Sequence, residues 1–285
     1  MRILAIFFFL LPISNIVTGN EIDQLKTVAE VQKFLMTKVN KKWNEESIIA
    51  YAGSEEDTFG KGKFFKLDLN NDSLTDIVID GRYLLAVVDS GNGRYGIFPI
   101  DRGAFTSNKY TLTNIINKDR IPLLVVRSYN EFTFATNDIA DTDTLVFKFG
   151  NFIEYNRNPD NLKIDRIKFS AMGCYGSCPV FELSIDRNRK GSYNAKKYNS
   201  KDGNFHAVIA EVEYNRLVAT INYIRLPKLN DNYRVNWTDD RTVKIEITYN
   251  NGKVKSISDY GAIGTFGLQN LYAQFHSLRN TQKWR

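Results

Sequence analysis

Two cysteines separated by three residues carry the most distinctive chemistry in this chain. Cys174 and Cys178 are its only cysteines, and Pro179 follows the second. A thiol pair at this spacing can close a disulfide, exchange electrons with another thiol, or bind a soft metal ion as two thiolates. In a protein that leaves the reducing cytosol, we expect the two to pair with each other. Closing so short a loop stabilises by roughly 2 kcal/mol, so the bond is expected to fix local shape.

A copper site is one alternative, because Cys-x-x-x-Cys-Pro is also the spacing of Sco-type copper chaperones. In those proteins two thiolates and a distant histidine suit copper, and this chain has two histidines, His206 and His276. There the second cysteine begins a helix, whose N-terminus stabilises a thiolate. Here Phe181, Leu183 and Ile185 alternate with polar residues, which is typical of a half-buried strand. Thiol-redox or metal chemistry is therefore the alternative to a structural disulfide.

An acidic loop in the first half is a candidate calcium site. Residues 68–78 read DLNNDSLTDIV, which resembles the Asp-x-Asn-x-Asp-Gly-x-x-Asp loop that binds calcium in FG-GAP repeats. The resemblance implies that the oxygen ligands come from Asp68, Asn70, Asp72, Leu74 and Asp76. Ser73 stands where the resembling loops have glycine, so it must adopt the left-handed conformation that glycine takes without steric cost. The alternative is an Asx-rich β-turn, in which these side chains accept hydrogen bonds from their own backbone.

A run of basic residues in the second half is a candidate anion-binding hairpin. Its members, with two tyrosines between them, are Arg187, Arg189, Lys190, Lys196, Lys197 and Lys201. Residues 161–285 hold 20 Lys and Arg against 11 Asp and Glu, whereas residues 20–160 hold 17 against 21. The simplest interpretation is a solvated basic face, and the functional alternative is contact with an anionic envelope component or glycan. An exported protein seldom meets nucleic acid, so we expect no nucleic-acid partner.

Carboxylates are the remaining candidates for catalysis. Asp239, Asp240 and Asp259 could in principle act as acid and base, as in glycosidases, which need no histidine. Asp239 and Asp240 are adjacent and precede Arg241, a pattern typical of a turn. The sequence contains no nucleophile elbow, no His-Glu-x-x-His zinc motif and no glycine-rich phosphate loop. We therefore name no catalytic residue, and a carboxylate-based hydrolase is the third hypothesis after a binding module and a thiol or metal site.

The first 19 residues have the features of an export signal. Arg2 precedes an apolar run from Ile3 to Ile13, and small residues at Thr18 and Gly19 suit cleavage near Gly19. The run is too short to span a bilayer, which takes about 20 residues, so an uncleaved anchor is the less favoured alternative. We expect a periplasmic or extracellular protein with no transmembrane segment in the mature chain.

The mature chain is predicted to be α+β, with two domains that each combine an antiparallel sheet with flanking helices. The polar segment 156–163 divides it into residues 20–158 and 159–285. In the first domain, apolar residues from Ile22 to Val39 recur at helical spacing and predict one amphipathic helix of about 20 residues, ending near Trp43. Strand-like segments then predict an antiparallel meander; they are 64–69, 77–79, 83–88, 95–100, 121–127 and 144–155.

The second domain is predicted to run strand, strand, helix, strand, strand, helix. Helical spacing covers 214–224 and 268–278, and Asn250-Asn251-Gly252 is a strong hairpin signal. Residues 167–170, the run CYGSCP at 174–179 and the strand after it resemble a family of bacterial domains of unknown function that share a CFGTCP-x-[FY] signature. The resemblance covers roughly residues 160–280, including Asp259-Tyr260-Gly261. It implies a secreted or envelope domain and transfers no activity.

These features favour an exported bacterial protein with a binding or structural role and no catalysis. That hypothesis expects oxidised, inert cysteines and an exposed aromatic or basic patch. The thiol hypothesis expects an accessible, acidic cysteine, and the hydrolase hypothesis expects two carboxylates facing each other in a cleft. Calcium is the one cofactor that the sequence suggests.

Overall fold

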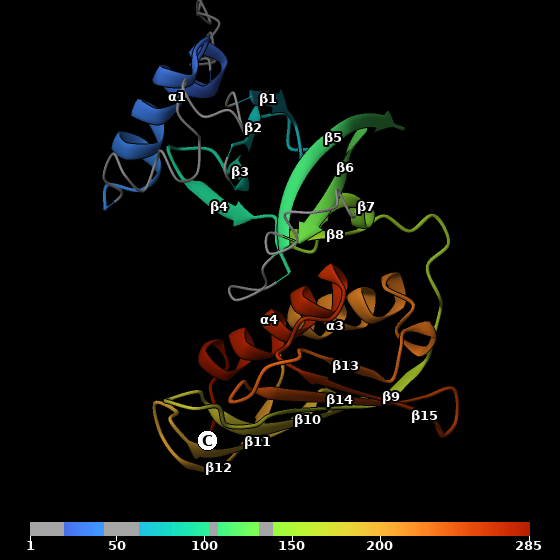
Figure 1. The fold of residues 1–285 in the computed structure, drawn as a ribbon. Coiled ribbons are helices and arrows are strands. Elements are labelled where there is room, and N and C mark those ends of the chain that lie inside the picture. The colour runs from blue at the N-terminus through green and yellow to red at the C-terminus, as the bar shows by residue number, and fades with distance from the viewer. Residues whose placement is uncertain (1–19, 43–62, 82, 103–107, 131–138) are drawn as a thin grey trace, which may run out of the picture.

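The computed structural model describes residues 20–42, 63–81, 83–102, 108–130 and 139–285. The expected export signal and the predicted end of the first helix near Trp43 lie outside these residues. Antiparallel sheets with few helices make up most of the described chain (Figure 1). None of the helices in these ranges is long and apolar enough to cross a membrane.

The N-terminal helical region is interrupted, whereas the sequence predicted one continuous helix. It consists of η1 (Glu21–Gln24), α1 (Val28–Phe34) and the π-helical turn η2 (Leu35–Val39). A capping box explains the break. The Thr27 hydroxyl accepts from the N–H of Glu30 at 3.2 Å, and the Glu30 carboxylate accepts from the N–H of Thr27 at 2.9 Å. Because these bonds satisfy the free amides of a helix N-terminus, α1 begins there.

Two four-stranded antiparallel sheets follow, where the sequence predicted a single meander. The first contains β1 (Lys63–Leu67), β2 (Asp76–Asp80), β3 (Leu84–Asp89) and β4 (Tyr95–Pro99) in chain order. The second contains β5 (Asn108–Lys118), β6 (Ile121–Asn130), β7 (Ile139–Lys148) and β8 (Asn151–Glu154). Strand β5 was not predicted, and the predicted strand 144–155 is a hairpin. Its turn is made by Phe149 and Gly150, which have φ angles of 55° and 81°.

Both faces of the first sheet are buried, which explains the long apolar runs of β2 and β3. Ile77 and Leu85 pack against Val31 and Leu35 of the helical region. The alternate residues face the second sheet and form a core with Leu124, among others. Alternation along each strand therefore fixes the order helix, sheet, sheet.

The second half contains one seven-stranded sheet covered on one face by two helices. Its strands are β9 (Ile164–Ala171), β10 (Val180–Asp186), β11 (Lys190–Lys197), β12 (Gly203–Val208), β13 (Asn232–Arg234), β14 (Thr242–Tyr249) and β15 (Lys253–Tyr260). The helices are α3 (Glu211–Tyr223) and α4 (Phe266–Thr281), with the short turn η3 (Leu226–Lys228) after α3. Spatial order is β12-β11-β10-β9-β14-β15-β13. The predicted strand-strand-helix-strand-strand-helix order is incomplete, because β11, β12 and β13 are additional, and β13 pairs in parallel with β15.

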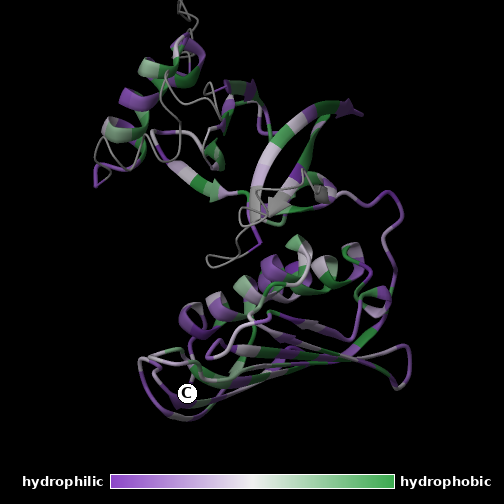
Figure 2. Ribbon diagram, in the orientation of Figure 1, coloured by the Kyte–Doolittle hydropathy of each residue, from purple (hydrophilic) through white to green (hydrophobic). Residues whose placement is uncertain are grey.

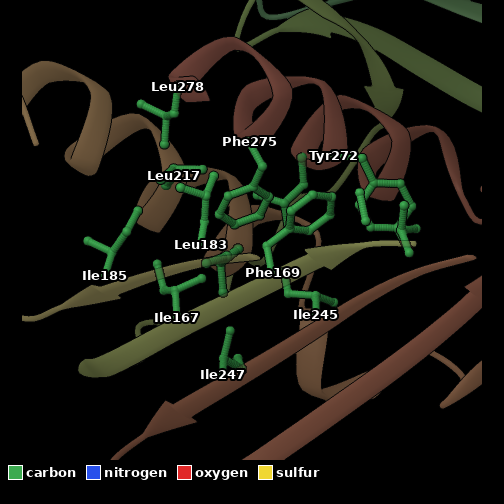
Figure 3. Packing of buried hydrophobic residues seen from close by; sticks show 14 of the residues in the cluster. Ile167, Phe169, Leu183, Ile185, Leu217, Ile245, Ile247, Tyr272, Phe275 and Leu278 are labelled. Carbon is green, nitrogen blue, oxygen red and sulfur yellow. The ribbon is translucent and has the colours of Figure 1, made fainter. Parts of the chain in front are cut away.

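Aromatic and aliphatic side chains of α4 and the central strands form the core of this half. Phe275 stacks on Phe169 with ring centroids 4.6 Å apart, above Ile167 and Ile245 (Figure 3). Hydrophobic and hydrophilic residues alternate along the strands, so the face opposite the helices is polar (Figure 2). That opposite face is the starting point for the site.

Candidate ligand-binding site

One face of the seven-stranded sheet is left uncovered by α3 and α4, which both lie on the other face (Figure 1). Because successive residues of a strand point to opposite faces, the strand register places two rows of polar side chains across the uncovered face. One row is Asn204, Asn194, Glu182, Ser170, Lys244 and Ser258. The next row is His206, Ser192, Ser184, Lys168, Glu246 and Ser256. All twelve side chains are exposed or half-buried.

Small side chains near the middle of these rows leave a hollow of about 520 Å³ in the sheet face. The serines that line it are Ser170, Ser184, Ser192 and Ser256. Asn194 and Asn204 add amide groups. Hydroxyl and amide groups each offer both a donor and an acceptor, so the hollow can satisfy a ligand rich in hydroxyl groups.

The charged side chains around the hollow are mostly paired. Lys168 Nζ lies 2.8 Å from Oε1 of Glu246, the residue directly opposite on the neighbouring strand β14. Lys196 Nζ lies 2.5 Å from Glu182 Oε1. Lys244 lines the same hollow, and in the part of the chain that the structure describes it forms no salt bridge. The hollow therefore offers one uncompensated cation among hydroxyl and amide groups, a combination suited to an anionic ligand.

The cysteine turn lies at one end of this sheet. Cys174 and Cys178 are joined by a disulfide with Cα atoms 5.7 Å apart, which confirms the expected pairing. The turn connects β9 to β10, so no helix begins at the second cysteine. The backbone N–H of Tyr175 donates to the carbonyl of Asp239 at 3.0 Å, and this bond anchors the turn to the loop before β14. The side chain of Tyr175 is 88% exposed.

Trp237 lies in the loop that holds the cysteine turn. Its Nε1–H donates to Asp240 Oδ2 at 3.1 Å, and the N–H of Asp240 donates to the hydroxyl of Tyr260 at 3.1 Å. Trp237 is 37% exposed, and Met172, directly after β9, is 40% exposed. We call Met172, Tyr175 and Trp237 the aromatic end of the sheet.

The acidic loop between β1 and β2 is closed by its own backbone. Asp68 accepts hydrogen bonds from the N–H groups of Asp72 at 3.1 Å and Ser73 at 3.0 Å, and Asp72 accepts from Leu74 at 2.9 Å. Ser73 has a φ of 70°, the left-handed conformation that the sequence required of it. These bonds are those of an Asx-rich turn.

Asp76, the last acidic residue of this loop, is hydrogen-bonded to backbone groups. It is fully buried, and its two oxygens accept from the N–H groups of Leu69 and Asp89, both at 2.8 Å. Burial raises the pKa of Asp76 to about 7, although the two amide bonds favour the charged form. Among the described residues, no three His, Cys, Asp or Glu side chains converge as a metal site. Calcium binding by this loop stays a prediction.

The six basic residues of the predicted hairpin lie at its two ends. Arg187, Arg189 and Lys190 lie around the β10–β11 turn, and Lys196, Lys197 and Lys201 lie where β11 ends and β12 begins. At about 3.3 Å per residue, Lys190 and Lys197 are roughly 23 Å apart along the strand. Arg189 lies 3.8 Å from Glu211, which compensates part of its charge. The structure therefore does not bring the six together.

The two histidines have different surroundings. His206 is an outward residue of β12 and lines the hollow. His276, on α4, lies against the ring edges of Phe169 and Phe181, with centroids 5.7 and 5.2 Å away. Burial lowers the pKa of His276 to about 4, and two nearby arginines contribute. The cysteine sulfurs are bonded to each other in this structure, and copper binding with His206 or His276 as a third ligand stays a hypothesis.

The candidate catalytic carboxylates have structural partners. Asp259 is fully buried and accepts from the N–H groups of Ile263 at 3.0 Å and Gly264 at 2.8 Å, and from the hydroxyl of Tyr272 at 3.2 Å. Burial raises its pKa. Asp259 lies on the helix-covered face of β15. Asp240 lies in the loop before β14, where it accepts a hydrogen bond from the indole N–H of Trp237. These contacts make Asp259 an anchor for the connection into α4.

Apart from His206, the residues of the hollow were not singled out from the sequence. Isolated serines and asparagines in strands match no motif, and β11 and β12 were not recognised as strands. The signal that could have found them is the recurrence of Ser at outward positions, such as Ser170, Ser184 and Ser192, in strands that pair with one another. That pairing is visible only once the strand order is known.

Comparison with known proteins finds a similarity in the half of the chain that carries the hollow and the aromatic end. Residues 165–279 match a family model described as a domain of unknown function (DUF6438). This segment is similar to DUF6438 domains. The match runs from β9 into α4, and so includes the hollow and the aromatic end, whereas the acidic loop lies outside it. No curated protein matches the chain.

Proposed function

We propose that this protein is an exported binding module of the bacterial envelope or exterior, and that the uncovered sheet face of its DUF6438-like half binds an acidic glycan. The observation that carries the proposal is the hollow itself, which combines several hydroxyl and amide groups with the uncompensated ammonium group of Lys244. A disulfide in the same half suits an oxidising compartment.

The chemistry of the hollow matches the chemistry of such a ligand. Sugar hydroxyls both donate and accept, as do the serine hydroxyls that line the hollow, so each can be satisfied without an unpaired group. A uronic acid carboxylate can form a charge-assisted bond with Lys244, which is stronger than a neutral one. The positive excess of residues 161–285 would attract a polyanion over a longer range.

Binding of a soluble polyuronate, polygalacturonate, tests the proposal by calorimetry. Lys244→Ala is expected to weaken binding about ten- to hundredfold, because a charge-assisted hydrogen bond contributes about 1.5–3 kcal/mol. Lys253→Ala is the matched control, since Lys253 is an exposed lysine of the same sheet at the β14–β15 turn, away from the hollow. Affinity should fall as salt is added.

Two results would overturn the proposal. One is an absence of polygalacturonate binding by the wild-type protein at low salt. The other is equal weakening by Lys244→Ala and Lys253→Ala, which would indicate a general charge effect and no site in the hollow.

A further inference from the structure

We infer that the aromatic end is a stacking platform for a pyranose ring, and that it extends the binding site beyond the hollow. This inference rests on the proposed function for its ligand class. It assigns the platform to Trp237 and Tyr175, and it assigns to the disulfide the task of holding Tyr175 in place.

The exposed indole of Trp237 is held in one orientation. Its Nε1–H is bonded to Asp240, and Asp240 is in turn fixed by its backbone bond to the hydroxyl of Tyr260 on β15. An exposed ring that is already immobilised loses little conformational entropy when a ligand stacks on it. Tryptophan and tyrosine provide large contact areas at low entropic cost for this reason.

Tyr175 lies in the short loop that the disulfide between Cys174 and Cys178 closes. The turn is anchored through its backbone, at Asp239, and by the bond between Cys174 and Cys178. The phenol ring of Tyr175 takes no part in that anchoring, and within the described residues it stacks on no other ring. A ring that is 88% exposed on a constrained turn is free to contact a ligand.

Met172, the third residue of the aromatic end, continues one polar row of the hollow. Met172 is the next outward residue after Ser170, and Thr242 is the next after Lys244, two residues along each strand. The N–H of Met172 donates to the carbonyl of Thr242 at 2.8 Å, so the two remain neighbours beyond the end of β9. Two residues of a strand span about 7 Å, so Met172 lies about that far beyond Ser170 of the hollow, which is within the length of a disaccharide.

The polar groups beside the indole favour a sugar over a lipid surface. Asp239 and Asp240 follow Trp237 in the same loop. Their carboxylates can accept hydrogen bonds from the hydroxyls at the edge of a stacked sugar. A membrane-anchoring indole would also leave its N–H free for the interface, whereas here it is bonded within the protein.

A neutral hexamer of β-linked glucose tests the platform separately from Lys244. We expect calorimetry to show that Trp237→Ala and Tyr175→Ala each weaken binding of this hexamer about tenfold, as is usual for an aromatic anchor. Tyr198→Ala is the matched control, because Tyr198 is also an exposed aromatic residue at this end of the sheet but lies beyond β11. Lys253→Ala, which lies outside the hollow, should bind the neutral hexamer as the wild-type protein does. Tryptophan emission should shift to shorter wavelength in the wild-type protein and remain unchanged in Trp237→Phe.

The outcomes separate the two proposals. Equal affinity of wild-type, Trp237→Ala and Tyr175→Ala for the hexamer, or no binding by the wild-type protein, overturns the platform. Phosphatidylglycerol vesicles that shift the Trp237 emission while the hexamer does not would overturn it in favour of a membrane contact. Failure of the proposed function is instead measured with polygalacturonate and Lys244→Ala. Equal thermal stability of the variants excludes unfolding as the cause of lost binding.

Discussion

The carboxylate of Glu154 caps the first turn of α4 by accepting the backbone N–H of Phe266 at 2.6 Å. Its second oxygen accepts from Gly267 at 2.9 Å. Glu154 is the last residue of β8, so a side chain of the first half satisfies the helix terminus of the second. Phe266 itself packs into the core between the two N-terminal sheets, against Tyr110 at a ring distance of 5.7 Å. The two halves therefore share a helix terminus as well as a linker.

Glu154→Gln should lower the free energy of unfolding by about 1–2 kcal/mol. The amide of glutamine supplies one acceptor in place of two, and the favourable interaction of a negative charge with the helix N-terminus is lost. Urea denaturation measures this loss. Glu211→Gln is the control, because Glu211 also lies in the first turn of a helix but its side chain is 73% exposed. An equally small effect of both substitutions would contradict a role for Glu154 in joining the halves.

Asp143 should make stability decrease with rising pH. Burial raises its pKa to about 6, Arg102 opposes the shift, and Asp141 and Glu154 reinforce it. Because the folded state binds the proton more tightly than the unfolded state, the protonated form is favoured in the folded protein, and this contribution is lost as pH rises from about 4 to about 6. Each pKa unit corresponds to on the order of 1 kcal/mol.

Asp143→Asn isolates this effect, because asparagine does not titrate. The stability of the variant relative to the wild-type protein should be constant below pH 4, increase between pH 4 and 6, and then level off. Urea denaturation across this range measures the difference. A difference that does not depend on pH would show that Asp143 has an ordinary pKa in the folded protein.

His276 should titrate near pH 4, because burial against Phe169 and Phe181 disfavours the charged imidazole. With only two histidines in the chain, NMR of the His206→Asn variant leaves a single imidazole to follow. A depressed folded-state pKa means that its stability contribution is lost as pH falls from 6.5 to about 4. A midpoint near 6.5 would show that the half-buried ring of His276 is not desolvated enough to disfavour its charged form.

The cysteine turn should be oxidised in protein recovered after export. Its mass should be lower than that of the reduced chain by two hydrogens, with an N-terminus near residue 20 if the export signal is cleaved as predicted. Cys174→Ser with Cys178→Ser should lower the free energy of unfolding by roughly 2 kcal/mol, on the loop-closure estimate. Recovery of a reduced chain with bound copper or zinc would instead support the metal-site hypothesis.

Asp72→Ala should destabilise the acidic loop by about 1 kcal/mol in the absence of calcium, because the N–H of Leu74 loses its acceptor. The same variant tests the calcium hypothesis. If calcium raises the melting temperature of the wild-type protein but not that of the variant, the loop binds the ion. Identical melting temperatures of the wild-type protein in calcium and in chelator would identify the loop as an Asx-rich turn only.

Elements with a strong local signal were predictable from the sequence. Alternation at Phe181, Leu183 and Ile185 predicted β10, and helical spacing predicted α3 and α4. Strands with weak apolar patterns were missed. In β11 the inward residues are Gly191, Tyr193 and Ala195, and the small residues Gly191 and Ala195 hide the alternation. Likewise, the break before α1 depends on the bonds between Thr27 and Glu30, which compete with an otherwise continuous helical pattern.

The sequence by itself determined the chemistry available to this protein: one cysteine pair, an Asx-rich loop, a basic second half and no catalytic motif. These are properties of residue type and short spacing, which local physics controls. Only the tertiary structure decided that Ser170, Ser184 and Lys244 share one hollow, and that Tyr175 and Trp237 share one end of the sheet. Strand order and register bring these residues together across long separations in the chain, and the pairing depends on burial of the opposite face against α3 and α4.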